Sequence, residues 1–99
     1  MKNGYKIHWT VHALNDLQNT ISYLEENFSD KEIRKLSAKI ENTIELISIN
    51  PNIFQMSDIK GVYKVVVVKY NTLYYRIRGN SVEILSFFSN RQSPKKLMF

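Results

Sequence analysis

The spacing of apolar residues in this 99-residue chain changes from a helical to a strand period after Pro51, and that change dictates most of the fold. In the first half the spacing is three or four residues, which is typical of amphipathic helices. One such stripe consists of Ala13, Leu14, Leu17, Ile21, Leu24 and Phe28. The next consists of Ile33, Leu36, Ile40, Ile44 and Ile47. Because the link between them is so short, the two helices must form an antiparallel hairpin with a shared apolar seam.

Local signals mark where each helix begins and ends. Thr10 is a suitable N-cap for the first helix, because its hydroxyl can accept a free backbone N–H of the first turn. Ser29 and Glu32 have the spacing of a capping box at the start of the second helix. Asn50-Pro51 ends that helix, since proline disfavours helical geometry in the residue before it.

The remaining segments have the period of two that is typical of strands. Tyr5–Trp9 predicts a half-buried strand before the helices, and residues 52–60 are expected to form a loop. The continuous β-branched run in Val62–Val68 favours a strand covered on both faces. Thr72–Arg78 alternates cleanly and is followed by the turn residues Gly79-Asn80 and a last strand over Ser81–Phe88.

These elements predict a single α+β domain over residues 1–99, in the order β-α-α-β-β-β. An N-terminal strand precedes the antiparallel helical hairpin, and a three-stranded antiparallel meander follows it. Short turns between the last three strands make the sheet largely antiparallel. The chain has no run of apolar residues long enough to span a membrane, its first residues lack the apolar core of a signal peptide, and it has no cysteine. We therefore expect a cytoplasmic protein without disulfides or cysteine-based metal sites.

The positive charge is concentrated in the last forty residues, which hold eight Lys and Arg side chains and one acid, Glu83. The first 59 residues hold six bases and eight acids. A basic, tyrosine-rich sheet segment is suited to an anionic partner. Lys31, Lys35 and Lys39, in contrast, form a row on the second helix among several glutamates, which indicates a solvated face.

The helical hairpin can cover only one face of the predicted sheet. The valine run therefore leaves apolar side chains on the other face, ringed by Arg and Lys, and such patches usually bind a partner. We predict that this surface consists of Val66, Val68, Tyr74 and Arg76. The alternative is that the C-terminal tail folds back over it.

Four landmarks, in order along nearly the whole chain, resemble the RelE/ParE superfamily of toxins from bacterial type II toxin–antitoxin pairs. They are Ile7–Thr10 with Ala13 and Asp16-Leu17, then Leu46–Pro51, then Gly61–Lys64 through Tyr70–Ile77, and finally Val82–Leu85 through Asn90–Leu97. The resemblance implies a helical hairpin on a small antiparallel sheet. It also implies a cognate antitoxin, whose acidic and apolar segment would wrap the basic sheet and the hairpin.

The superfamily divides by target. RelE-like members cut mRNA in the ribosomal A site, whereas ParE-like members poison DNA gyrase and need no catalytic residues of their own. Lys64 matches the nucleases' strand lysine and Arg91 their tail arginine. Thr72, however, stands where they carry a basic residue, and Leu97 stands where they carry a tail aromatic with an exchangeable proton. These departures favour the ParE-like branch.

The primary prediction is therefore a gyrase-binding toxin that is not itself an enzyme. The alternatives are a ribosome-dependent endoribonuclease with Lys64 and Arg91 as electrostatic stabilisers, and a non-toxic relative that only binds an antitoxin. The residues predicted to contact the target or nucleic acid are Lys64, Arg76, Arg78, Arg91, Lys95 and Lys96. His8 and His12 lack metal-ligand spacing, so no metal and no cofactor are expected.

Overall fold

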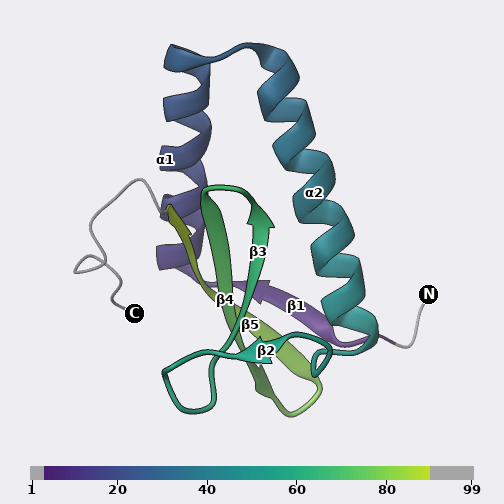
Figure 1. Cartoon of the computed structure of the whole chain (residues 1–99). Coiled ribbons are helices and arrows are strands. Elements are labelled where there is room, and N and C mark those ends of the chain that lie inside the picture. The colour runs from purple at the N-terminus through teal and green to yellow at the C-terminus, as the bar shows by residue number, and fades with distance from the viewer. Residues whose placement is uncertain (1–3, 90–99) are drawn as a thin grey trace.

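The computed structural model describes residues 4–89 and shows two helices against a five-stranded sheet (Figure 1). The helices are α1 (Val11–Asn27) and α2 (Asp30–Ile49). The strands are β1 (Lys6–Trp9), β2 (Gln55–Met56), β3 (Tyr63–Val68), β4 (Asn71–Arg78) and β5 (Ser81–Ser89). Their order in the sheet is β1-β5-β4-β3-β2.

The predicted α+β architecture is confirmed. The two helices form an antiparallel hairpin on the sheet, with α1 packed against β5 and α2 against β3 and β1 (Figure 1). The core lies in this interface, because alternate strand residues and one side of each helix turn toward it. Its most deeply buried side chains include Ala13, Ile47, Leu73, Tyr75, Val82, Ile84 and Phe87.

The sequence predicts a largely antiparallel sheet, which the structure has, but it does not predict two of the strand pairings. β1 pairs in parallel with β5, so that Lys6 lies opposite Ser81 and Trp9 opposite Ile84. The predicted loop also contains β2, a two-residue strand that pairs with the start of β3. A parallel pair joins segments far apart in the chain, and a two-residue strand has too little alternation to show a period, so neither leaves a local signal.

The predicted cap of α1 is confirmed, and the predicted capping box of α2 is wrong. Thr10 caps α1, where its hydroxyl accepts the backbone N–H of Ala13 at 3.2 Å. At α2 the hydroxyl of Ser29 makes no capping hydrogen bond. The N–H of Glu32 donates instead to the backbone carbonyl of Ser29 at 3.0 Å, which satisfies that N–H without the predicted capping box.

The expectation that the valine strand is covered on both faces is wrong. Val66 is 64% exposed, whereas Val67 is buried. The β3–β4 register also shifts between Val66 and Val68, which marks an irregularity at the end of the strand. Val68 consequently packs against the core on the helix side instead of joining Val66.

Two tyrosines of the sheet form hydrogen bonds with the segment that follows α2. The buried hydroxyl of Tyr75 donates to the carbonyl of Pro51 at 2.7 Å, and the ring of Tyr63 stacks on that of Tyr75 at 5.2 Å. The hydroxyl of Tyr63 in turn donates to Oδ1 of Asn52 at 2.9 Å. These contacts fix the segment that leads into β2.

Candidate functional site

The sheet face turned away from the helices gathers several of the predicted site residues, and we call it the open face. Lys64 lies directly opposite Tyr74 across the β3–β4 pair, and Val66 lies opposite Thr72. Directly paired residues point to the same side of a sheet, so these four side chains share one surface. They line a hollow of about 690 Å³ together with Ile53, Phe54, Gln55 and Val65.

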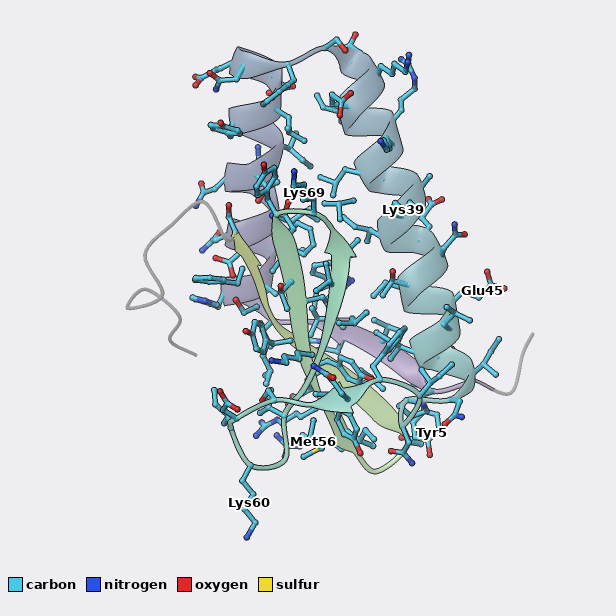
Figure 2. The ribbon with its side chains drawn as sticks, in the orientation of Figure 1. Tyr5, Lys39, Glu45, Met56, Lys60 and Lys69 are labelled. Carbon is cyan, nitrogen blue, oxygen red and sulfur yellow. The ribbon has the colours of Figure 1, made fainter. Side chains whose placement is uncertain are left out.

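Exposed apolar side chains border this hollow. Val66 on β3 and Ile53 before β2 belong to its lining, and they are 64% and 50% exposed. Met56 on β2 is 48% exposed, and Lys60 extends away from the domain in the loop that follows (Figure 2). A partly apolar hollow beside a lysine is suited to a protein partner that carries both apolar and acidic groups.

Tyr74 is the titratable neighbour of Lys64 on the open face. Partial burial, followed by the negative charge of Asp58, raises the pKa of the Tyr74 phenol above its ordinary value. The phenol therefore stays protonated at neutral pH. It can donate a hydrogen bond but is a poor acceptor of a proton from a substrate.

The two strand arginines of the predicted target-binding set are joined to an acid. Nε of Arg76 lies 2.6 Å from Oε1 of Glu83, and Nη1 of Arg78 lies 3.7 Å from Oε2 of the same carboxylate. The hydrogen bond from Arg76, reinforced by the charges of Arg76, Arg78 and His8, lowers the pKa of Glu83. One carboxylate thus offsets part of the positive charge that these arginines would offer to phosphates.

The other predicted residues are distributed as follows. Val68 lines a groove on the helix side of the sheet, and Arg91, Lys95 and Lys96 lie outside the described residues. Nε2 of His12 lies 3.4 Å from Oδ2 of Asp16, one turn away on α1. His8 on β1 lies opposite Glu83 on β5. Between residues 4 and 89 no group of three or more His, Asp or Glu side chains is arranged to hold a metal ion.

Sequence reasoning missed several residues that shape the open face. Ile53, Phe54 and Gln55 fall in the predicted loop, yet they form one wall of the hollow. The only available signal was Pro51, which marks the end of α2 but does not reveal that the next segment pairs with β3. Neither helix of the described range is long and apolar enough to cross a membrane.

The comparison that decides the family covers most of the chain. Residues 7–94 match the family model for the ParE toxin of the type II toxin–antitoxin system parDE. This chain belongs to the ParE toxin family. No curated protein matches it by sequence.

Solved structures agree with the ParE family at the level of the fold. The chromosomal ParDE toxin–antitoxin system from P. aeruginosa has a chain with TM-score 0.73 and 16% identity, covering 89% of this chain and 98% of that one. The YoeB/ParE toxin from Agrobacterium tumefaciens has TM-score 0.63 and 15% identity, with 85% and 96% covered. The YoeB–YefM complex from Staphylococcus aureus contains a chain with TM-score 0.59 and 20% identity, with 84% and 93% covered.

Proposed function

We propose that this ParE-family chain is a toxin that inhibits growth by binding and poisoning DNA gyrase, and that a cognate antitoxin neutralises it. The observation that carries the proposal is the composition of the open face. It combines Lys64 and the exposed Val66 in one hollow, which is a surface for binding a protein. The family membership supplies the class of activity.

The chemistry of the open face supports binding over RNA cleavage. Cleavage requires a base for the ribose 2′-hydroxyl and cations that stabilise the phosphorane. Lys64 is a cation, but Tyr74 beside it is held in its protonated form. Thr72 is only 7% exposed, and Arg76 is paired with Glu83. Within residues 4–89 the open face therefore offers a poor set for RNA cleavage.

The antitoxin is the proposed obligatory partner. The related YoeB is known in a complex with YefM, and ParE in a ParDE system. The exposed apolar side chains and the basic charge of this chain suit an acidic antitoxin segment, whose charge would speed the encounter and whose apolar side chains would make the complex tight. Val66, Tyr74 and Arg76 are the proposed contacts on the open face, and Val68 the proposed contact on the helix side.

Pulse-labelling after induction of the chain alone in a bacterial host tests the target. We expect DNA synthesis to fall before protein synthesis, and purified chain to increase gyrase-dependent DNA cleavage. Lys64→Glu should weaken both effects, whereas the matched reversal Lys31→Glu on α2 should leave them unchanged. An early fall in protein synthesis would instead identify a ribosome-dependent nuclease. Normal growth with retained antitoxin binding would identify a non-toxic relative.

A further inference from the structure

Four basic side chains form two rows across the part of the open face that β4, β5 and β1 build (Figure 1). The register places Arg76 and His8 on either side of Glu83. Two residues further along the strands, it places Arg78 and Lys6 on either side of the same central strand. Directly paired residues point to the same side of a sheet, so the four bases share one surface. We call this surface the basic strip.

Sheet geometry sets the size of the basic strip. Its two rows are about 7 Å apart, and the two bases of one row, on either side of β5, are about 10 Å apart. The intervening residues Tyr75, Val82 and Ile84 are buried in the core, so the strip lies on the side of the sheet away from the helices. The sequence predicts a nucleic-acid contact for the two arginines only, because the bases of β1 join them through the long-range pairing with β5.

Glu83 lies beneath the two arginines of the strip and does not cover them. Its side chain is 19% exposed, whereas those of Arg76 and Arg78 are 45% and 63% exposed. The hydrogen bond from Arg76 uses Nε, which leaves the two terminal nitrogens of its guanidinium to donate to a ligand. Lys6 forms no ion pair with another residue of the 4–89 range. An approaching anion therefore meets three permanent positive charges before it meets one negative charge.

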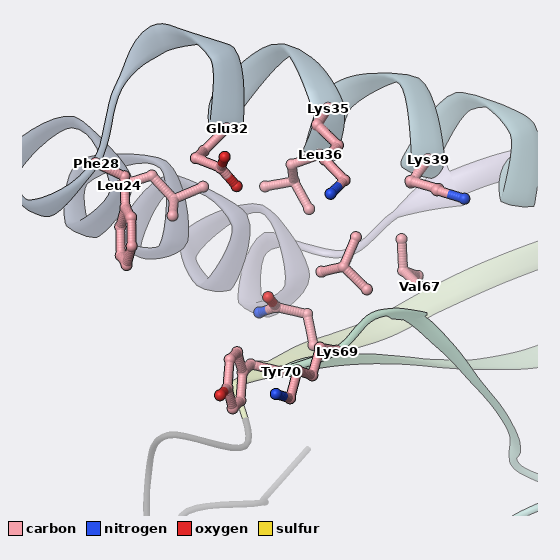
Figure 3. Close-up of a pocket in the computed structure, with 11 residues that line it drawn as sticks. Leu24, Phe28, Glu32, Lys35, Leu36, Lys39, Val67, Lys69 and Tyr70 are labelled. Atoms are coloured by element: carbon pink, nitrogen blue, oxygen red, sulfur yellow. The ribbon is translucent and has the colours of Figure 1, made fainter.

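The composition of the strip favours a nucleic acid over a protein as its ligand. None of the large apolar side chains that are exposed in the described range belongs to β1, β4 or β5. Lys35, Lys39 and Lys69, in contrast, surround a groove between the helices and the β3–β4 turn, and its lining includes Leu36 and Phe28 (Figure 3). Protein interfaces have an apolar centre, whereas interfaces with DNA are more polar and much more positively charged.

We propose that the basic strip binds the phosphate backbone of duplex DNA. An arginine can donate two hydrogen bonds to one phosphate, and Lys6 adds a flexible positive charge. Duplex DNA carries one negative charge per about 1.7 Å of helix axis, so several phosphates can lie over the strip. The role of this contact rests on the proposed function: the hollow at Lys64 contacts gyrase, and the strip contacts the DNA that gyrase holds. Backbone contacts read no bases, so we expect no sequence preference.

Fluorescence anisotropy of a labelled duplex of about 20 base pairs, titrated with the purified chain, measures the contact. We expect a Kd of about 1 to 100 µM near physiological salt, which is the range of non-specific DNA binding. The affinity should fall as the salt concentration rises from about 50 to 200 mM, because each phosphate that a base neutralises releases counterions. A duplex of unrelated sequence should bind equally well.

The double variant Lys6→Ala/Arg78→Ala removes one base from each side of β5 and leaves the ion pair of Arg76 in place. Its affinity for the duplex should fall about fivefold or more. The slope of log affinity against log salt should become shallower by about 2, or about one for each lost phosphate contact. The matched control Lys35→Ala/Lys39→Ala removes the same charge from α2, and its affinity should change by less than about twofold because salt screens distant charges.

Glu83→Gln provides a test in the opposite direction. The amide oxygen of glutamine can still accept the N–H of Arg76, but the negative charge beneath the strip is lost. Affinity for the duplex should therefore rise about two- to fivefold, the size of one exposed charge interaction. The gain should appear even though the loss of the ion pair makes the domain less stable. A purely structural role of Glu83 predicts weaker binding instead.

Three results overturn the inference. The first is that the duplex does not bind at low salt, or that the Lys6→Ala/Arg78→Ala variant binds it as the control does. The second is tighter binding of a single-stranded RNA of the same length, which assigns the strip to RNA. The third is equally tight binding of labelled polyglutamate, which assigns it to an acidic protein.

The duplex assay contains no gyrase, so its outcome is separate from that of the gyrase assignment. Failure to bind DNA overturns the role of the strip and leaves the hollow at Lys64 as the proposed gyrase contact. A chain that binds the duplex through the strip but does not increase gyrase-dependent cleavage overturns the gyrase assignment and leaves the DNA contact in place.

Discussion

The carboxylate of Asp16 on α1 accepts a hydrogen bond from the backbone N–H of Phe87 on β5, with Oδ2 3.0 Å from the nitrogen. The same oxygen accepts the hydroxyl of Ser86 at 2.8 Å. The register of β1 with β5 ends at Ile84, so it does not reach this part of β5. A helix side chain thus takes the place of a strand at the edge of the sheet.

Asp16→Ala should lower the free energy of unfolding by about 2 to 3 kcal/mol, because it leaves a backbone N–H and a hydroxyl without their charged acceptor. Asp16→Asn should lower the free energy of unfolding by less, since its amide oxygen can still accept these hydrogen bonds. Urea denaturation of both variants measures the difference. Gln18→Ala, at an exposed position of the same helix, serves as the control. Equal losses in all three variants would contradict the assigned role.

The buried phenol of Tyr75 predicts a loss of stability in alkali. Burial, followed by the neighbouring Tyr63, raises the pKa of Tyr75 from 10.0 to about 12. Since the folded state holds this proton more tightly than the unfolded chain, the stabilisation is complete below pH 10 and is lost as the pH rises to about 12. Tyr75→Phe should therefore show a flatter alkaline stability profile by chemical denaturation. A profile parallel to that of the wild type would refute this assignment.

Glu83 predicts the opposite dependence on the acidic side. Its pKa is lowered from 4.5 chiefly by the hydrogen bond from Arg76. Its contribution to the free energy of unfolding is therefore present above pH 4.5 and is lost as the pH falls through the lowered pKa of the folded state. The midpoint of thermal unfolding of Glu83→Gln should lie below that of the wild type at pH 7, and the two should converge in acid. Added salt should also narrow the gap at pH 7, since the pair is partly exposed. A gap that persists in acid would point to packing instead.

Gly4 is required by close approach to the end of α2. An added Cβ would collide with Oγ of Ser48 and would lie 3.1 Å from the carbonyl oxygen of the same residue, which accepts the N–H of Tyr5. Gly4→Ala should cost about 1 to 3 kcal/mol, because the strand must move away from the helix. The cost should be smaller in a Ser48→Ala background, where the nearest atom is absent. An identical cost in both backgrounds would show that Ser48 is not the obstacle.

The parts of the fold that sequence predicts are the parts that depend on local pattern. The helical stripes and the cap at Thr10 involve residues within a turn or two of each other. The pairing of β1 with β5 and the contact between Asp16 and Phe87 join residues about seventy positions apart. No periodicity records such contacts, so the sequence predicts the elements but not the parallel edge of the sheet.

The candidate site shows the same division. The strand pattern assigns Val66 and Tyr74 to one face, and the family resemblance singles out Lys64. The register places all three on the same face. Val68 was assigned to that face by the same rule, but the irregularity at the end of β3 moves it to the other. Ile53 gave no signal at all, because it lies in the predicted loop and its place beside the open face follows from the pairing of β2 with β3.

The parallel pairing at the edge of the sheet also determines how late during its synthesis the domain can fold. β5 lies between β1 and β4, so the earliest strand to leave the ribosome gains its partner only after the last described strand has emerged. Domains fold as units, and contacts between distant segments form late. The nascent chain therefore stays without its complete sheet until Ser81–Ser89 has left the ribosome, and the assembled domain with its open face forms only after β5 has been made.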